Sequence, residues 1–179
     1  YGEVHSTDWM KLTLLEVNVD AYEYTGKTLY LPNSRLITSS IKNLNFLQFD
    51  LNEIDQLNLD RKFSLCISVE VLEHLLPKTT EMFINKLCES SDVVLFSAAY
   101  KNQGGINHIN ERVHSDWFKF FERNSYEVYD LFREKLWDNQ AIQVWHRQNI
   151  FLYVRNHSDV SLNLKSKGIM PMINPSFMN

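Results

Sequence analysis

The feature that most constrains the fold is a regular alternation, from Leu44 onward, of short apolar runs with segments whose apolar residues recur at helical spacing. Apolar runs of about four to eight residues predict buried strands, and apolar residues three and four apart predict one-sided helices. The predicted strands are 44–49, 63–69, 92–99, 126–132 and 149–155, and the predicted helices are 78–88 and 115–123. This order predicts an α/β fold with a doubly wound, mostly parallel sheet, in which the last two strands pair as an antiparallel edge hairpin.

The two ends of the chain lack this regularity. At the front, residues 12–19 predict one strand that ends at Asp20, and residues 21–40 predict turns with one short element. Residues 157–179 contain two prolines and no apolar period. We therefore expect a domain over 1–156, truncated or degenerate at its N-terminus, and an extended tail over 157–179. That tail is expected to wrap over the domain or to bind a protein partner or a second copy.

Charge and composition disfavour several classes of partner. The chain has 18 Lys and Arg against 22 Asp and Glu, a formal net charge of −4, and no basic run that could follow a phosphate backbone. No apolar run reaches membrane-spanning length, and the start lacks the pattern of a secretion signal. We therefore expect a soluble, cytoplasmic protein that does not bind a membrane, and the charge disfavours non-specific binding to nucleic acid while leaving local contact open. Cys66 and Cys88 have no metal-binding or redox spacing and are predicted to be buried free thiols.

Glycine is scarce, and its scarcity excludes the common nucleotide-binding loops. The five glycines stand at positions 2, 26, 104, 105 and 168. Neither a G-x-G-x-x-G loop nor a phosphate-binding loop can be built from these positions.

Polar and ionisable residues follow the predicted strands at their carboxyl ends. They are Asp20, Asp50, Glu70, Glu73, His74, His108 and Glu111. Ligands of open α/β sheets bind outside the carboxyl ends of the strands, at the edge where these residues would converge. The sequence therefore predicts one crevice lined by carboxylates and imidazoles.

Several motifs together resemble one enzyme family. The run FSLCISVEVLEHL at 63–75 is similar to the fourth-strand signature of the class I S-adenosylmethionine-dependent methyltransferases, and FLQFDLNE at 46–53 is similar to the strand before it. Residues 93–137 resemble a subgroup whose fifth strand is followed by H-x-N-E and an aromatic helix, and 148–156 resemble its closing strand. The resemblance covers Leu44 to Asn156 and implies a Rossmann-like methyltransferase sheet.

The resemblance also implies a cofactor and a class of reaction. S-adenosylmethionine would be the cofactor, with Asp20 at the ribose, Asp50 and Leu51 at the adenine, and Glu70 also in contact with it. The subgroup is often found with glycan-building enzymes, which implies a small-molecule acceptor and, as a hypothesis, O-methylation of a sugar or related metabolite.

The chain departs from the family in its N-terminal part, where the family has a strand that ends in a D/E-x-G-x-G-x-G loop. Here the nearest segment, Leu15 to Asp20, contains no glycine. Either Glu16 is the acidic residue of a degenerate first strand, or Asp20 ends the second strand and the loop is absent from this chain. An upstream segment carrying the loop would restore the enzyme hypothesis. The main rival is a non-catalytic methyltransferase-fold protein, either a pseudoenzyme or a subunit of an assembly.

The proton transfer that O-methylation requires points to a histidine. His108 lies on the loop expected to cover the acceptor, and Glu111 is three residues away, where it can orient the imidazole; the alternative is a loop histidine bonded to backbone. His74 is a second candidate catalytic residue.

A metal-dependent alternative rests on the same segment. Glu70, Glu73 and His74, with His108 as a conceivable fourth, resemble the E-x-x-E-H metal ligands of small-RNA 3′-terminal 2′-O-methyltransferases. The motif E-V-L-E-H also occurs in many metal-free methyltransferases, so we assign no metal ligand, and the net charge of −4 disfavours an RNA acceptor.

Two groups of residues rich in aromatic side chains lie in the second half of the chain. Trp117, Phe120 and Phe121 share one face of the predicted helix 115–123 and are predicted to be core. A second group flanks the connection between the last two strands, where it either grips a sugar or phosphate or forms a packed ridge. Its members are Arg133, Trp137, Trp145 and His146.

Overall fold

The computed structural model describes residues 13–15, 21–23, 49–161 and 173. The strands are β1 (Thr13–Leu15), β2 (Ala21–Glu23), β3 (Leu65–Val69), β4 (Val93–Ser97), β5 (Tyr126–Tyr129) and β6 (Phe151–Arg155). The α-helices are α2 (Thr80–Ser90), α3 (His114–Arg123), α4 (Arg133–Leu136) and α5 (Val144–Asn149), and the short 3-10 helices are η1 (Leu51–Gln56), η2 (Leu72–His74) and η3 (Pro77–Thr79). None of the helices in this described part has the length and apolar character needed to cross a bilayer.

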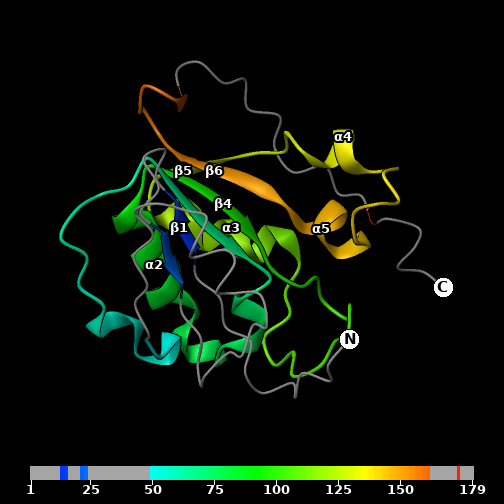
Figure 1. Cartoon of the computed structure of the whole chain (residues 1–179), viewed down its shortest axis with the longest axis horizontal. Helices are drawn as coiled ribbons and strands as arrows, with labels where there is room; N and C mark the ends of the chain where they lie inside the picture. Colours follow the sequence, from blue (N-terminus) through cyan, green and yellow to red (C-terminus); the bar gives the residue numbers. More distant parts are fainter. Residues whose placement is uncertain (1–12, 16–20, 24–48, 162–172, 174–179) are drawn as a thin grey trace, which may run out of the picture.

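The strands form one six-stranded sheet in the order β2-β1-β3-β4-β6-β5 (Figure 1). β3 pairs in parallel with β4, whereas β1 is antiparallel to its neighbours β2 and β3, and β6 is antiparallel to its neighbours β4 and β5. As a result β2, β3, β4 and β5 all run in one direction, opposite to β1 and β6. The predicted α/β fold with an antiparallel edge hairpin is confirmed. The sequence did not predict that the last strand, β6, would lie inside the sheet, between β4 and β5.

Most predicted elements are present, and the differences concern short ones. The predicted strands over 63–69, 92–99, 126–132 and 149–155 contain β3 to β6, and the predicted helices contain most of α2 and α3. The prediction for 44–49 lies outside the described residues except for Phe49, which is in no strand. α4 and α5 were not predicted, because helices of four and six residues are too short to show a periodic pattern. The division into a domain and a tail at 156 stays a prediction.

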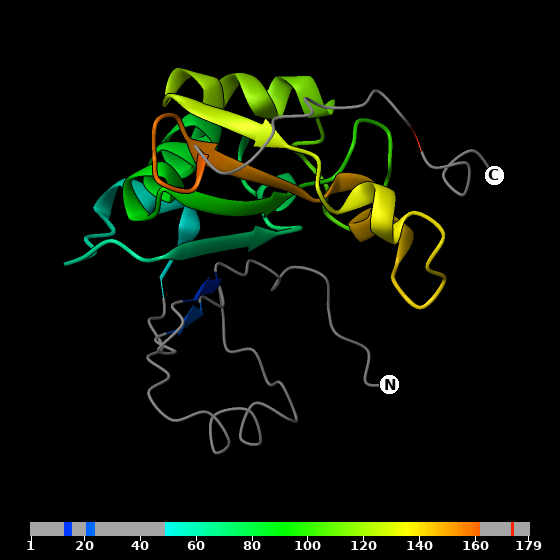
Figure 2. The ribbon, with the colours of Figure 1, turned by 90° about the horizontal axis from the view of Figure 1, so that it is seen from above.

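The core lies between the sheet and the two longest helices. α2 and α3 pack against each other, and Figure 2 shows them together on one side of the strands. Phe96 of β4 contacts the rings of Trp117 and Phe121 of α3, with centroids 5.9 and 5.2 Å apart, and Phe121 stacks on Tyr153 of β6 at 3.8 Å. Trp117 and Phe121 are therefore core residues, as predicted. Cys66 and Cys88 are buried free thiols, which is also as predicted.

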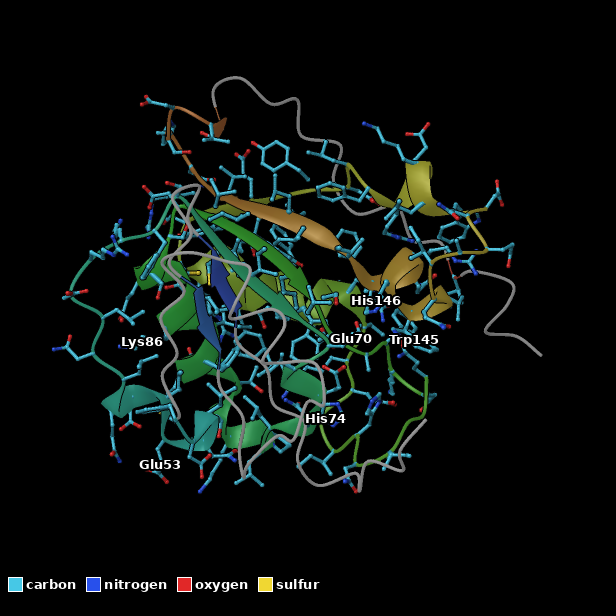
Figure 3. All side chains as sticks on the ribbon, in the orientation of Figure 1. Glu53, Glu70, His74, Lys86, Trp145 and His146 are labelled. Carbon is cyan, nitrogen blue, oxygen red and sulfur yellow. The ribbon has the colours of Figure 1, made fainter. Side chains whose placement is uncertain are left out.

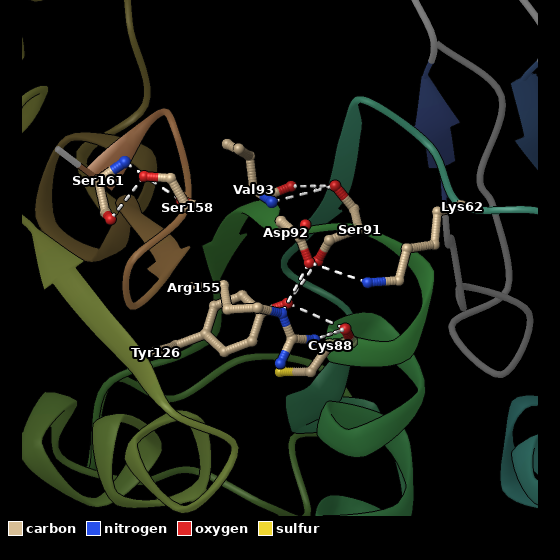
Figure 4. Close-up of polar contacts among 9 residues, drawn as sticks. All are labelled: Lys62, Cys88, Ser91, Asp92, Val93, Tyr126, Arg155, Ser158 and Ser161. Atoms are coloured by element: carbon tan, nitrogen blue, oxygen red, sulfur yellow. Dashed lines mark hydrogen bonds and ion pairs between the residues drawn. The ribbon is translucent and has the colours of Figure 1, made fainter. Parts of the chain in front are cut away.

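A polar cluster fastens the sheet to α2 at the amino end of β4 (Figure 4). The Asp92 carboxylate accepts hydrogen bonds from Arg155 Nε at 2.6 Å and Lys62 Nζ at 3.0 Å. Arg155 and the Tyr126 hydroxyl both donate to the carbonyl of Cys88, one of the carbonyls that end α2 without a helical partner. Partial burial raises the pKa of Asp92, but the two cations outweigh this effect and leave the pKa below its ordinary value.

A buried histidine begins α3. The His114 ring contacts Tyr100 and Phe151 edge to face, with centroids 4.8 and 4.9 Å apart, and its Nε2 lies 3.1 Å from Asn149 Oδ1. Burial lowers the pKa of His114 to about 4, a shift that Arg133 reinforces and the bond to Asn149 opposes. The imidazole is therefore neutral in the folded protein near pH 7.

This histidine should make the protein acid-sensitive. The folded pKa of His114 lies below the unfolded value of about 6.5, so the unfolded state binds this proton first as the pH falls. The contribution of the neutral His114 to the free energy of unfolding is therefore fully present above pH 6.5 and decreases by about 3 kcal/mol in all as the pH falls toward 4. In His114→Gln the free energy of unfolding should be lower at pH 7.5 but should fall less on acidification, as measured by urea denaturation at pH 7.5 and 4.5. His157→Asn, at an exposed position, is the control. Equal losses in wild type and His114→Gln would contradict the prediction.

Candidate active site

A cavity of about 280 Å³ lies at the carboxyl ends of β3 and β4. Its wall combines the residue after β3, the turn η2, the loop after β4 and one side chain from α5. The lining residues are Glu70, Glu73, His74, Gln103, Gly104, Gly105, His108 and Trp145. Figure 3 shows Glu70, His74 and Trp145 gathered at this end of the sheet. This is the edge where the sequence predicted a crevice of carboxylates and imidazoles.

Glu70 is held at the end of β3 by the neighbouring strand. Its N–H donates to the carbonyl of Ser97 at 3.0 Å, and the Ser97 hydroxyl donates to its Oε1 at 2.7 Å. Its φ of +52° is in the left-handed region, which costs free energy for a residue with a Cβ. The two bonds to Ser97 hold Glu70 in this conformation, with its side chain on the cavity wall.

Glu73 is a fully buried carboxyl group, and neither of its oxygens has a hydrogen-bond partner. Burial and the neighbouring Glu70 raise its pKa well above the ordinary value. The backbone N–H groups of Ala99 and of Glu73 itself act in the opposite direction, but they do not reach hydrogen-bonding geometry and are outweighed. An unpaired buried carboxyl group on a cavity wall indicates a site that is completed by a ligand.

The turn after β3 is fastened to the loop after β4. The carbonyl of Glu73 accepts hydrogen bonds from the N–H groups of Ile109 and Asn110, at 2.9 and 3.1 Å. The buried Asn110 amide in turn donates to the carbonyl of Leu72 at 3.1 Å and to Thr80 Oγ1 at 2.9 Å. These bonds fix Glu73 and His74 relative to His108.

His108 and Glu111 form the pair that the sequence predicted. His108 Nδ1 lies 3.0 Å from Glu111 Oε1, and the two side chains are only 12% and 16% exposed. The other oxygen of Glu111 accepts the N–H of Asn102 at 2.8 Å, so the carboxylate is held from both sides. Because a carboxylate only accepts, it selects the tautomer with a proton on Nδ1 and leaves the lone pair of His108 on Nε2.

His74 packs edge to face against His108, with ring centroids 4.8 Å apart. Its partial burial and the nearby His108 lower the pKa of His74, while contact with the backbone of Asn107 opposes them. A neutral His74 places no second positive charge beside His108.

Gly105 makes room for the His108 imidazole. A Cβ at position 105 would lie 2.4 Å from His108 Cε1, whereas a Cβ at Gly104 would meet nothing within 4 Å. Both glycines have positive φ, +73° at Gly104 and +147° at Gly105. The role of Gly105 as the position that makes room for the His108 ring is visible only in the structure.

One group of side chains in the cavity could also hold a metal ion. The potential ligand atoms of Glu73, His74 and His108 all lie within 4.8 Å of one another. Ligand atoms around one ion with bonds of about 2.1 Å lie about 3 to 4.2 Å apart, so small side-chain shifts would complete such a site.

The other predicted site residues lie away from this cavity or beyond the described residues. Asp50 is exposed and caps η1, where its carboxylate accepts the N–H of Asn52 at 2.9 Å. Leu51 is fully buried in the core, and Asp20 lies outside the described residues. The structure therefore brings together Glu70, His74, His108 and Glu111.

The aromatic and basic group near α4 and α5 separates into different roles. Arg133 is fully buried, 3.1 Å from Asp130 and stacked over the rings of Trp137 and Phe151. Trp145, by contrast, is 37% exposed and lines the cavity. The cavity residues that the site prediction did not include are Gln103, Gly104, Gly105 and Trp145. Trp145 belonged to the aromatic and basic group that could bind a sugar or phosphate, whereas no sequence signal pointed to Gln103.

Comparison with known proteins gives a likeness in structure and none in sequence. No family model and no curated protein sequence matches the chain. The structure is similar to the magnesium protoporphyrin IX methyltransferase of Synechocystis PCC 6803 with bound S-adenosylmethionine, with a TM-score of 0.52 and 16% identity. That match covers 75% of this chain, and the chain spans 59% of the length of the Synechocystis enzyme.

Two further structures are similar to this chain over a larger share of their own length. The YcgJ protein of Bacillus subtilis matches with a TM-score of 0.50 and 11% identity, over 76% of this chain and 82% of that one. A chain from the complex between the Haloferax volcanii Trm112 methyltransferase activator and a methyltransferase matches with a TM-score of 0.50 and 13% identity, over 76% and 72%. The protein therefore has the α/β fold of the S-adenosylmethionine-dependent methyltransferases.

The two glycines of the loop provide a matched test of how His108 is held. Gly105→Ala should displace the imidazole and lower the free energy of unfolding by about 1–3 kcal/mol, whereas Gly104→Ala carries only the cost of its positive φ. The measurements are the Cε1–H NMR signal of His108 and urea denaturation of both variants. A His108 signal that moves equally in both variants would show that Gly105 does not seat the ring.

Proposed function

We propose that the protein is an S-adenosylmethionine-dependent methyltransferase that methylates an oxygen of a sugar or a related small metabolite. The observation that carries this proposal is the His108–Glu111 pair, held 3.0 Å apart on the wall of a cavity at the carboxyl ends of β3 and β4. In a fold of this class, that edge of the sheet is where ligands bind. The family resemblance is what favours a sugar among the possible acceptors.

The described residues fit the charged end of this cofactor. S-adenosylmethionine carries a positively charged sulfonium, and the cavity presents the carboxyl group of Glu70. When bound, it supplies an electrophilic methyl group, and its departing thioether is neutral. Asp50 would have to leave its cap on η1 to join the site, and the Leu51 side chain is enclosed in the core. Glu70 is therefore the described cofactor-binding residue with the best placement, and Asp20 remains a proposal.

The chain's own task is to place the acceptor and remove its proton. His108 Nε2, which carries the lone pair, accepts the proton of the acceptor hydroxyl as the new bond to carbon forms. The Glu111 carboxylate, fixed by Asn102, then stabilises the positive imidazolium. His74 stays neutral beside it because of its lowered pKa and does not repel that charge.

Replacing the base should separate catalysis from binding. His108→Gln should lower kcat by about 10²–10⁴-fold and leave the affinity for S-adenosylhomocysteine nearly unchanged. Transfer of labelled methyl from S-adenosylmethionine to a panel of methyl pyranosides measures kcat, and calorimetric titration measures the affinity for S-adenosylhomocysteine. His146→Gln, on α5 but not on the cavity wall, is the matched control.

Calorimetric titration with S-adenosylhomocysteine tests the first premise without an acceptor. Micromolar binding by wild type and by His108→Gln supports the proposal. A folded chain that binds no S-adenosylhomocysteine would contradict it and favour a non-catalytic methyltransferase-fold protein.

A second candidate function is metal-assisted methylation of an RNA 2′-hydroxyl. The observation that favours it is the grouping of Glu73, His74 and His108, with the carboxylate oxygens of Glu73 unpaired. In this candidate His108 would be a metal ligand and not the general base, because its one lone pair cannot bind a metal and accept a proton at once. The net charge of −4 and the carboxyl groups of the cavity oppose an RNA acceptor.

Metal titration decides between the two candidates. If the metal-assisted mechanism holds, Mn²⁺ should bind with one-to-one stoichiometry, Glu73→Gln and His74→Gln should each weaken that binding by about 10–100-fold, and a chelator should abolish methyl transfer. Methyl transfer that persists in EDTA would rule out the metal-assisted mechanism and leave His108 as the base.

A further inference from the structure

The cavity has one flat aromatic residue among polar ones. Trp145, on α5, is 37% exposed and lines the same cavity as Glu70, Glu73 and His108. Its neighbours in the sequence are half-buried, and the other tryptophan of this region, Trp137, lies against Arg133 and does not line the cavity. Leaving a large indole partly in water is unfavourable, and a ligand that covers it would recover that free energy.

The rest of the wall is rich in hydrogen-bond acceptors and poor in positive charge. Glu73 has two unpaired oxygens and is fully buried. Glu70 adds a second carboxyl group, and Glu111 stands behind His108. The described residues that line the cavity include no lysine or arginine. Such a wall suits an acceptor with several hydroxyl donors and disfavours an acceptor that carries a phosphate group.

From this arrangement, and given the proposed methyltransferase function, we infer that the acceptor is an uncharged pyranose whose C–H face stacks on Trp145 while a ring hydroxyl donates to Glu73. A pyranose combines both requirements, because its faces carry C–H groups and its edge carries hydroxyls. A purely aromatic ligand would cover the indole but leave Glu73 unpaired, which costs about 1–3 kcal/mol. A sugar phosphate or nucleotide would bring its negative charge against Glu70.

Saccharide binding can be tested without methyl transfer. The probes are methyl β-D-glucopyranoside, methyl β-D-galactopyranoside and methyl α-D-mannopyranoside, with glucose 6-phosphate as the charged comparator. The chain is labelled with ¹⁵N and titrated in EDTA, and the four tryptophan indole N–H signals are followed by NMR. At least one methyl pyranoside should shift the Trp145 signal saturably, and glucose 6-phosphate should bind at least about tenfold more weakly.

Matched variants separate stacking from general damage. Trp145→Leu should weaken pyranoside binding by about tenfold or more, whereas Trp137→Leu, which lies outside the cavity, should leave it unchanged. Glu73→Leu should weaken binding by about tenfold through loss of the hydroxyl contact. Circular dichroism and urea denaturation confirm that each variant is folded.

Three results would overturn the inference: no shift of the Trp145 signal with any pyranoside, equal binding of glucose 6-phosphate, or binding that requires added Mn²⁺. The S-adenosylhomocysteine titration on the same sample distinguishes this failure from failure of the proposed function. Cofactor binding without pyranoside binding would overturn only the inference that the acceptor is a pyranose. Pyranoside binding without cofactor binding would instead overturn the proposed methyltransferase function and leave the saccharide-binding site standing.

Discussion

The parallel pairing of β3 with β4 is the constraint on which the rest of the site depends. Its register places Val69 opposite Ser97, so that the next residue, Glu70, meets Ser97 through both its N–H and its carboxylate. Both strands end at the same edge of the sheet, which brings the turn after β3 against the loop after β4. The bonds from Ile109 and Asn110 to the carbonyl of Glu73 are possible only because of that alignment.

The molecule contrasts two ways of burying polar groups. At the amino end of β4, the half-exposed Arg155 binds Asp92, and Arg155 and the buried Tyr126 hydroxyl both donate to a terminal carbonyl of α2, so the buried carbonyl is satisfied. At the carboxyl end, the buried Glu73 carboxyl has no partner, and its pKa is raised by burial and by Glu70. The first arrangement stabilises the fold, whereas the second costs stability and is typical of a binding site.

The chemistry of the cavity turns on how His108 is held. The absence of a Cβ at Gly105 leaves the space that the His108 ring occupies. Glu111 fixes the tautomer of His108 and also accepts a hydrogen bond from the N–H of Asn102 in the same loop. The same ring lies beside His74 and within reach of a metal site with Glu73. A proton acceptor and a metal ligand need the same lone pair, so the occupant of the cavity decides which role His108 has.

Local sequence patterns determined the main secondary structure and the position of several polar residues along it. The apolar run of β3, the helical spacing of α2 and α3, and the i, i+3 spacing of His108 and Glu111 all act over a few residues, and each was predictable. Tertiary structure alone decided that β6 lies between β4 and β5, that Glu73 is buried without a partner, and that Trp145 lines the cavity while Arg133 does not. These outcomes depend on strand pairing and packing between residues far apart in the sequence, whose free energies no local pattern encodes.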